Sequence, residues 1–382
     1  MHNILLLASS TAIAACLTLS STVMATPDQD LVTLTDDYWA WVLKENPVFA
    51  SSLGIRDYEN EVRDASLEAE DRRTNIAQIF LTRLQKIRKI KLSSSERINL
   101  SILRRTLMEQ IEANDFGQRA INFTNRGGWH QQFANMANNL PFNTVADYLS
   151  YVERLKKYKQ VNDQSMAVAN LAIEGGYTLP CDAMQGYEGS ISGLIREDPR
   201  QSRFFEPFTR TLPGTINVQQ FAMIEASAIS VIKKIIYPAL QKHYDWYVED
   251  YAPSCSIEPG ISSQPGGRDY YEFRIRQMTT TQLSADEIHN IGLSEVSRIR
   301  AEMIEVASNA GYDSREIFIE ELRTNPRYYA KSPEELMEKV ARLTKTADGK
   351  MPGLFGNLPR LPYGLKEIPA ETAEGNTTAY YN

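Results

Sequence analysis

The sequence is poor in the residues from which metal and thiol sites are built. Its 382 residues include three cysteines and four histidines. Neither a Gly-x-Gly-x-x-Gly motif nor a phosphate-binding loop occurs, which argues against dinucleotides and nucleoside triphosphates as ligands. His130, His243 and His289 lie far apart, so no two of them sit one helical turn apart as in peptidase zinc sites.

Serine and carboxylate chemistry find little support either. The segment Gly189–Gly193 has Ile191 where a nucleophile elbow has serine, and Ser230 with Lys233 lacks the companion motifs of penicillin-binding enzymes. The many carboxylates fit solvated helix faces. A carboxylate-based hydrolase acting without metal therefore has no acid pair that can be named. We expect no catalytic residue and no metal ligand in this chain.

Charge is missing from the first 25 residues, which contain no Asp, Glu, Lys or Arg, and residues 4–19 are almost wholly apolar. This pattern predicts a signal peptide over residues 1–25, cleaved after Ala25. The apolar run is shorter than the roughly 20 residues that a membrane-spanning helix needs. A second interpretation is a lipobox ending at Cys16, whose side chain would be acylated. The protein is thus expected to be periplasmic or secreted, or a lipoprotein attached to the membrane through Cys16.

Residues 26–382 keep the net charge of -7. Because the balance is acidic and we recognise no Lys/Arg cluster, nucleic acid is not the expected partner. In an oxidising compartment Cys181 and Cys255 would either pair or remain two solitary buried thiols. No repeat or linker divides these residues, so we expect them to be the N-terminal and middle part of one large helical domain.

Helical patterns dominate this region, because apolar residues recur every three or four positions over long stretches. Ser93 with Glu96 predicts a capping box, and Ser332 followed by Pro333 predicts a helix start. Strand signals are confined to residues 270–276 and 379–382. The sequence therefore predicts a mainly α fold with long antiparallel helices and a small β element near the C-terminus. The predicted helices cover about residues 31–45, 67–90, 93–111, 144–175, 217–247 with a kink at Pro238, 284–310, and 333 onward.

Two loops with paired glycines are candidates for a ligand cleft. Residues 125–132 read Asn-Arg-Gly-Gly-Trp-His-Gln-Gln, and residues 266–270 read Gly-Gly-Arg-Asp-Tyr. Loops that combine glycine with long polar side chains often face ligands, although a simple structural turn is the alternative for each. The candidate cleft residues are Arg126, Trp129, His130, Arg268 and Tyr270.

From Pro265 onward the order of residues resembles a known family. The most specific block lies at 279–303 and includes Leu283-Ser-Ala-Asp-Glu-Ile-His289. Asn325-Pro-Arg-Tyr-Tyr329 and Phe355-Gly-Asn-Leu-Pro-Arg-Leu-Pro-Tyr363 follow, and further matches reach back to Asn46-Pro47. The chain resembles the bacterial family catalogued as domain of unknown function 885, whose members include exported proteins and lipoproteins.

The resemblance implies a helical fold related to zinc metallopeptidases, with a His-Glu pair, a following Pro-Gly-His-His and a later acidic ligand. In that family the metal motif follows the strand that Tyr380, Tyr381 and Asn382 would begin here, so it is expected beyond Asn382. Such a strand holds an extended peptide beside the metal. We expect zinc in the full-length protein and no cofactor in these 382 residues, which would form an inactive fragment.

The leading interpretation is thus an exported zinc-dependent peptidase-like hydrolase that acts on a peptide-like substrate. The alternative is a non-enzymatic helical module of the cell envelope, which binds a peptide or protein partner in a cleft lined by the two Gly-Gly loops. If the missing part of the protein packs on the core of this chain, the isolated chain exposes that apolar face. We therefore also expect exposed apolar surface and poor solubility of the isolated chain.

Overall fold

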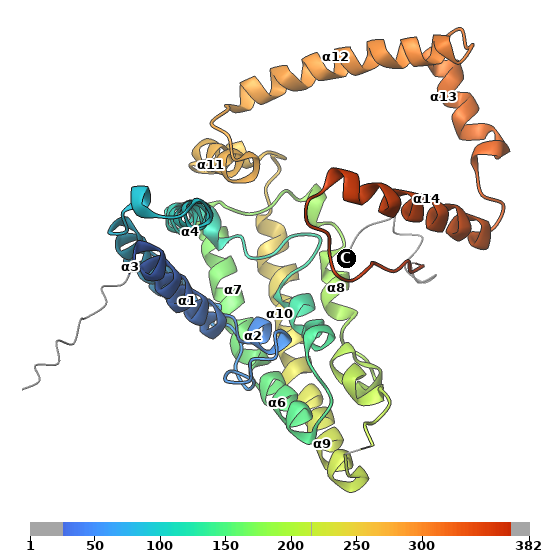
Figure 1. Cartoon of the computed structure of the whole chain (residues 1–382). Helices are drawn as coiled ribbons and strands as arrows, with labels where there is room; N and C mark the ends of the chain where they lie inside the picture. The colour runs from blue at the N-terminus through green and yellow to red at the C-terminus, as the bar shows by residue number, and fades with distance from the viewer. Residues whose placement is uncertain (1–25, 215, 368–382) are drawn as a thin grey trace, which may run out of the picture. The chain divides into compact units, whose positions relative to one another are not determined.

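The computed structural model describes residues 26–214 and 216–367, and these residues are mainly α-helical (Figure 1). Within them β structure is limited to two isolated bridges, Thr124 with Gly127 and Pro180 with Ser256. The mainly α prediction is confirmed. The predicted signal peptide, Cys16 and the C-terminal strand lie outside the described residues. Contacts divide the chain into one unit up to Ala285 and a second from Asp286.

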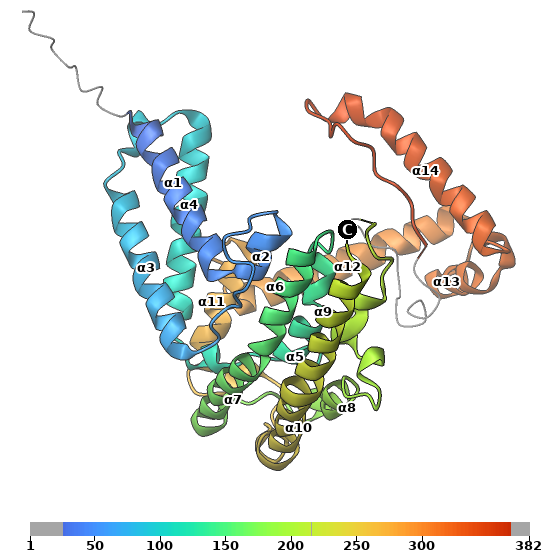
Figure 2. The same cartoon turned by 90° about the horizontal axis from the view of Figure 1, so that it is seen from below.

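The first unit begins with three helices that we call the N-terminal layer: α1 (Pro27–Glu45), α3 (Leu67–Gln85) and α4 (Ser94–Ala113). They lie side by side, and the short α2 (Pro47–Ser52) follows α1 (Figure 2). The Ser93 hydroxyl caps α4 by accepting from Glu96 N, as predicted. The Ser93 N–H, however, donates to Asp28 Oδ1 at 3.0 Å instead of to Glu96, which ties the start of α1 to the start of α4.

The layer has an aliphatic core. Because the helices are amphipathic, each one turns leucines toward its neighbours and leaves most of its charged residues outside. The buried members are Leu31, Leu34, Ala77, Phe80, Leu81, Leu84, Leu92, Leu100, Leu103 and Leu107.

The remaining helices of this unit up to residue 254 form what we call the aromatic body: α5 (Trp129–Ala134), α6 (Val145–Lys156), α7 (Tyr158–Gly175), α8 (Tyr187–Ser192), α9 (Val218–Val231) and α10 (Tyr237–Trp246). The predicted helix at 144–175 begins at the Thr144 cap and ends before Gly176 as expected, but it breaks at Lys157. The predicted helix at 217–247 contains the π-helical segment Ile232–Ile236 just before Pro238. Pro238 cannot donate to the preceding turn, so an irregularity there is expected.

A buried arginine of α6 fastens both α2 and the segment after it. Arg154 is 2% exposed and donates to three backbone carbonyls, those of Pro47, Tyr58 and Glu61, at 2.9–3.1 Å. It also donates to Ser51 Oγ at 2.7 Å. Burial lowers the pKa of Arg154 to about 10, and the four acceptors compensate for the lost hydration of its charge.

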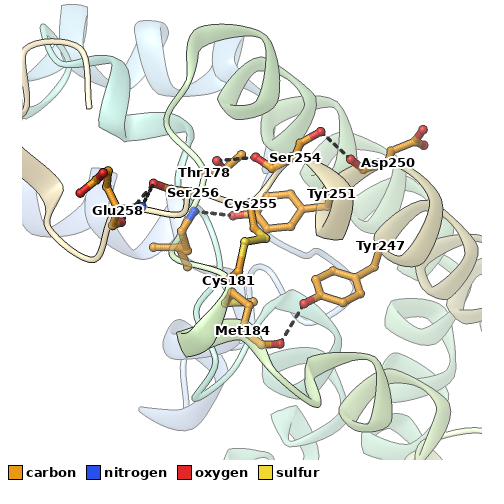
Figure 3. Close-up of a disulfide and its surroundings, with 11 residues drawn as sticks. Thr178, Cys181, Met184, Tyr247, Asp250, Tyr251, Ser254, Cys255, Ser256 and Glu258 are labelled. Carbon is orange, nitrogen blue, oxygen red and sulfur yellow. Dashed lines mark hydrogen bonds between the residues drawn. A yellow bond between two sulfur atoms is a disulfide. The ribbon is translucent and has the colours of Figure 1, made fainter. Parts of the chain in front are cut away.

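Cys181 and Cys255 form a disulfide across 74 residues of chain, which settles the choice between pairing and free thiols (Figure 3). The bond joins the segment after α7 to the segment after α10. Short backbone pairing reinforces it, because Cys181 N donates to Ser256 O at 2.9 Å and Ser256 N donates to Leu179 O at 3.0 Å. Tyr247 Oη, on the helix before Cys255, donates to Met184 O at 3.0 Å.

The predicted strand at residues 270–276 is wrong, because these residues lie within α11 (Gly267–Thr279). The helix starts where Gly267 passes so close to Ile261 that a Cβ would approach the Ile261 carbonyl oxygen to 1.9 Å. Tyr270 and Phe273, three residues apart, then both pack on Phe116 with centroid distances of 5.4 and 5.2 Å. The packing of these two rings on one side of a helix outweighs the alternating residue pattern that predicted a strand.

The second unit comprises α12 (Ala285–Asn309, with its first residue at the boundary), α13 (Arg315–Thr324) and α14 (Pro333–Leu354). α12 starts within one residue of the predicted position 284, and α14 starts after the predicted Ser332 cap. Ala307 is the one buried hydrophobic residue among the described part of this unit. Large apolar side chains of α12, among them Leu293, Ile304 and Val306, are more than half exposed. The expected exposed apolar surface is present here.

Candidate functional site

The segment from Thr124 to His130 turns the chain into α5. Thr124 and Gly127 exchange two backbone hydrogen bonds of 2.9 and 3.0 Å, which places Arg126 in an exposed turn. Gly128 caps α5, and a Cβ at this position would come within 2.4 Å of the Tyr187 hydroxyl. Trp129 and His130 are then directed into the core, where both are buried.

Two histidines far apart in sequence meet inside the aromatic body. His130 and His243 are both 0% exposed, and their ring centroids lie 5.1 Å apart with the rings nearly perpendicular. Trp129 stacks on His243 at a centroid distance of 4.2 Å. The third histidine, His289, is exposed on α12, at the acidic start of the helix.

Hydrogen bonds define the state of His130. Ser190 Oγ donates to Tyr187 O at 2.7 Å, so it is left to accept from His130 Nε2 at 3.0 Å. The proton of His130 therefore resides on Nε2, and Nδ1 faces the Tyr187 hydroxyl at 3.5 Å. Burial lowers the pKa of His130 to about 4, and burial together with nearby His130 lowers the pKa of His243 to about 2. Both rings are neutral near pH 7.

The histidine pair does not fit the zinc that the family resemblance implies. A zinc site needs three or four protein ligands. Among residues 26–214 and 216–367, no group of three or more His, Cys, Asp or Glu side chains could hold a metal ion. In addition, Ser190 already engages His130 Nε2. The pair is a packing element of the core, and we derive no catalytic step from it.

A pocket of about 440 Å³ opens beside Trp129. Its lining comes from the loop before α3, from α3 itself, from the turn before α5, and from α5 and α7. The buried part is apolar and consists of Trp129, Phe133, Met136, Val161 and Val168. The polar part includes Arg63, Asp64, Glu70, Arg73, Arg119, Asn122, Gln132 and Ser165. Pockets of this size with an apolar body and a few polar groups are typical of small-molecule sites.

Arg73 holds the pocket rim in place. Its guanidinium is 4% exposed and donates to Glu45 Oε2 and Glu70 Oε2, both at 2.8 Å, and to Asp64 O at 2.7 Å. These bonds use donors on all three nitrogens of the fork. Arg73 is therefore a structural cation, which joins α1, α3 and the rim loop.

Asp64 fixes the same loop from the other side. Its Oδ1 accepts from Ser66 N at 3.0 Å, Ser66 Oγ at 2.8 Å and Gln164 Nε2 at 2.8 Å. Burial favours the protonated acid, but these bonds and nearby Arg72 and Arg73 outweigh it and lower the pKa of Asp64. Because residues of α3 and of α7 both form hydrogen bonds with the loop, the pocket is preformed.

Two groups in the pocket retain binding capacity. Asn122 Nδ2 donates to Ser165 O at 2.8 Å, whereas Asn122 Oδ1 is buried without a hydrogen-bond partner among the described residues. Arg119 bonds Asp71 and Asn114 through Nη1 alone, which leaves its other N–H groups available. An apolar molecule with an N–H donor and a carboxylate would match this arrangement.

The structure separates the predicted cleft residues. Trp129 lines the pocket, whereas Arg126 is exposed, His130 lies behind Trp129 in the core, and Arg268 is exposed on α11. Tyr270 packs on Phe116. Tyr380, Tyr381 and Asn382 lie outside the described residues.

Sequence reasoning missed the other pocket residues. Arg63, Arg119 and Asn122 stand in no motif, and their grouping depends on how the rim loop and α7 meet. Gln132, within the first glycine loop, had a local signal because it follows two glycines in a polar segment.

These features define an all-helical scaffold with a preformed mixed pocket. The chain belongs to the bacterial protein family of unknown function DUF885, which matches residues 47–382. Its fold is similar to the crystal structure of a putative lipoprotein from Colwellia psychrerythraea, with a TM-score of 0.79 and 19% sequence identity. The match covers 93% of this chain and 64% of that chain, so the chain spans somewhat less than two thirds of its solved neighbour.

No protein of curated function matches the sequence. Among the described helices, none is long and apolar enough to cross a membrane.

Proposed function

We propose that the full-length protein is an exported zinc-dependent peptidase-like hydrolase, and that the described helices contribute its peptide-binding scaffold. Membership of DUF885 supports the assignment through the resemblance described above. The carrying observation is the 440 Å³ pocket, because its apolar floor, unpaired Asn122 carbonyl and free Arg119 donors match an apolar peptide end. In this proposal the zinc ligands come from a part of the protein outside the described residues.

Two further observations support the assignment of peptide binding to the described helices and of zinc binding to another part of the protein. The solved neighbour has about a third of its chain without a counterpart here, enough for a metal-binding part. The exposed apolar side chains of α12 would then be covered by additional structure, since large exposed apolar faces usually mark contacts. Export and a lipid anchor at Cys16 belong to the same proposal, and they agree with the description of the solved neighbour as a putative lipoprotein.

Metal analysis tests the hydrolase. We expect full-length protein to contain one zinc per chain and to cleave peptides in a reaction that a chelator stops and added zinc restores. The 382-residue chain should do neither. Absence of metal from the active full-length protein would refute the zinc proposal.

Peptide binding by the 382-residue chain tests the pocket separately. The probe is the tripeptide Ala-Ala-Phe as free acid, measured by calorimetry against its C-terminal amide. We expect the amide to bind about tenfold more weakly, because it loses a charge-assisted bond to Arg119. Arg119→Gln should remove this preference, whereas Arg126→Gln, in the exposed turn, should keep it. Equal binding of acid and amide would contradict the assignment.

The alternative of a non-enzymatic envelope module uses the same pocket. It would be favoured if full-length protein binds the tripeptide with the same preference but contains no zinc. The two experiments together therefore distinguish a hydrolase from a binding module.

A further inference from the structure

The loop between α3 and α4 is strongly basic, although the chain as a whole is acidic. Lys86, Arg88, Lys89 and Lys91 fall within six consecutive residues. Residues 86–105 carry seven basic side chains and one acidic side chain, a net charge of +6 in a chain of net charge -7. The expectation that the chain has no Lys/Arg cluster is therefore wrong, because the acidic balance of the whole chain conceals this one.

Most of these cations have no partner. Lys86, Arg88, Lys89, Lys91 and Arg104 are exposed, and none makes an ion pair or a side-chain hydrogen bond within residues 26–214 and 216–367. Arg73 differs from them, because each of its three side-chain nitrogens donates a hydrogen bond to an oxygen. A surface that another part of the protein covered would not be built this way, because a buried unpaired charge costs several kcal/mol.

Exposed isoleucines lie among the cations. Ile90 is 86% exposed, and Ile98 and Ile102, one turn apart on α4, are 61% and 59% exposed. A shallow depression of about 500 Å³ brings Lys89 together with Ile98 and Ile102. Its other members are Ser94, Arg97, Ser101 and Arg105. Apolar and basic side chains therefore share one surface.

The same surface extends toward α11. A second depression, of about 380 Å³, shares Lys89, Ser101 and Arg105 with the first and adds Arg104 and Arg276. Glu109 pairs with Arg105 and Glu112 with Arg276, so these two arginines are partly neutralised. We call the residues 86–105 with these depressions the basic hairpin surface.

We propose that the basic hairpin surface docks the protein on an anionic lipid bilayer. Lipid headgroups supply the phosphates for the unpaired cations, and the exposed isoleucines enter the headgroup layer. The rest of the chain carries a net charge of -13, since +6 of the total of -7 resides at 86–105. The bilayer repels that remainder, so charge alone orients the hairpin toward the membrane.

The start of the described chain agrees with this orientation. Asp28, in the first turn of α1, accepts a hydrogen bond from Ser93 N at the base of the basic loop. The eleven peptide links between Cys16 and Pro27 span at most about 40 Å. An acyl chain on Cys16, as proposed above, would leave the hairpin within reach of the same bilayer. The docking does not depend on acylation, so it goes beyond the proposed function.

Vesicle binding tests the proposal with the protein from Thr26 onward, which has neither the apolar leader nor Cys16. Co-sedimentation compares vesicles of equal parts phosphatidylglycerol and phosphatidylcholine with pure phosphatidylcholine. We expect binding to the anionic vesicles alone, weakening as salt increases. K89E/K91E should lower the partition coefficient at least about tenfold, because each basic residue near such a surface contributes about fivefold.

Matched variants control for charge and hydrophobicity. K233E/K234E reverses two exposed lysines after α9 and should bind nearly as the parent protein does. I98S/I102S should weaken binding about fivefold. V218S/M223S removes two side chains of α9 that are each 68% exposed and should have no effect.

Three results would overturn the proposal: equal binding to neutral vesicles, equal effects of K89E/K91E and K233E/K234E, or displacement of the bound protein by duplex DNA. The last would identify a general polyanion surface. Circular dichroism confirms that each variant keeps its helices, so a loss of binding reports the surface.

Discussion

The N-terminal layer and the aromatic body differ in how many polar side chains they bury. The layer has a core of leucines with Phe80 and Ala77, and among its cations Arg73 alone is buried, beside the pocket. The body combines aromatic rings with buried polar side chains, among them Asn162, His130 and His243, all 0% exposed. Arg154, at 2%, belongs with them.

This difference shows which interactions determine the structure of each region. A buried polar group needs a partner in one geometry, as when Trp129 Nε1 donates to Asn162 Oδ1 at 2.8 Å and Asn162 donates to Ala239 O at 3.1 Å. Such bonds fix the walls of the pocket. The layer needs little more than its amphipathic pattern, so its outer face is free to carry the unpaired cations of the basic hairpin surface.

Removal of the disulfide should separate the two regions most strongly. Cys181→Ser with Cys255→Ser should lower the free energy of unfolding by about 4 kcal/mol, because a loop of 74 residues regains entropy in the unfolded chain. Hydrogen exchange should show the loss in α8 and α10, with α3 and α4 still protected. Equal loss in α3 and α4 would mean that layer and body unfold as one.

Loss of Arg154 tests the buried polar bonds directly. Arg154→Leu should lower the free energy of unfolding by about 3 kcal/mol, since it removes the hydrogen bonds that Arg154 donates to the carbonyls of Pro47, Tyr58 and Glu61. Urea unfolding measures the change. The exposed Arg126→Leu is the control and should stay within about 0.5 kcal/mol. A similar loss for both variants would contradict the role of Arg154.

Local signals predicted much of the fold. The caps at Ser93 and Ser332 agree with the structure, because a cap depends on side chains within three or four residues. The break at Lys157 and the helix at 267–279 were not predicted. Tertiary packing decides the second, as the contact of Phe116 with Phe273 of α11 illustrates.

The site was far less predictable. His130 and His243 meet through helix packing, and no spacing in the sequence indicates it. The pocket is likewise lined by residues that lie far apart in the sequence, from Val48 to Val168. Among the predicted cleft residues, only Trp129 belongs to it. The basic hairpin surface, in contrast, was visible in the sequence at Lys86–Lys91 and was lost by averaging charge over the chain.

Acid should weaken the body through its histidines. Their pKa values fall from 6.5 unfolded to about 4 and about 2 folded, so the unfolded chain binds more protons below pH 6.5 and stability decreases there. At pH 5 each histidine should contribute about 2 kcal/mol of this decrease.

His243→Phe should remove its share of that dependence, about 2 kcal/mol between pH 7.5 and pH 5. At pH 7.5 the variant should be as stable as the parent or more so, since neither nitrogen of His243 has a hydrogen-bond partner among the described residues. Urea unfolding at both pH values measures the difference. The exposed His289→Phe should leave the pH dependence unchanged. An unaltered slope in His243→Phe would mean that water or a ligand pairs with this ring.

The smallest expected effect lies in α11, which contacts the layer, because Arg105 donates to Gln277 O at 2.8 Å. The segment just before α11 is held by Gln118, which donates to Pro265 O at 3.0 Å. Thr280 ends α11 with φ of 60°, where a β-branched residue is strained. Thr280→Asn should raise the free energy of unfolding by about 1 kcal/mol, because asparagine tolerates this conformation better. Thr280 lines the basic hairpin surface but carries no charge, so vesicle binding should not change. A gain in stability accompanied by weaker vesicle binding would show that the strained turn shapes the surface that carries the layer's unpaired cations.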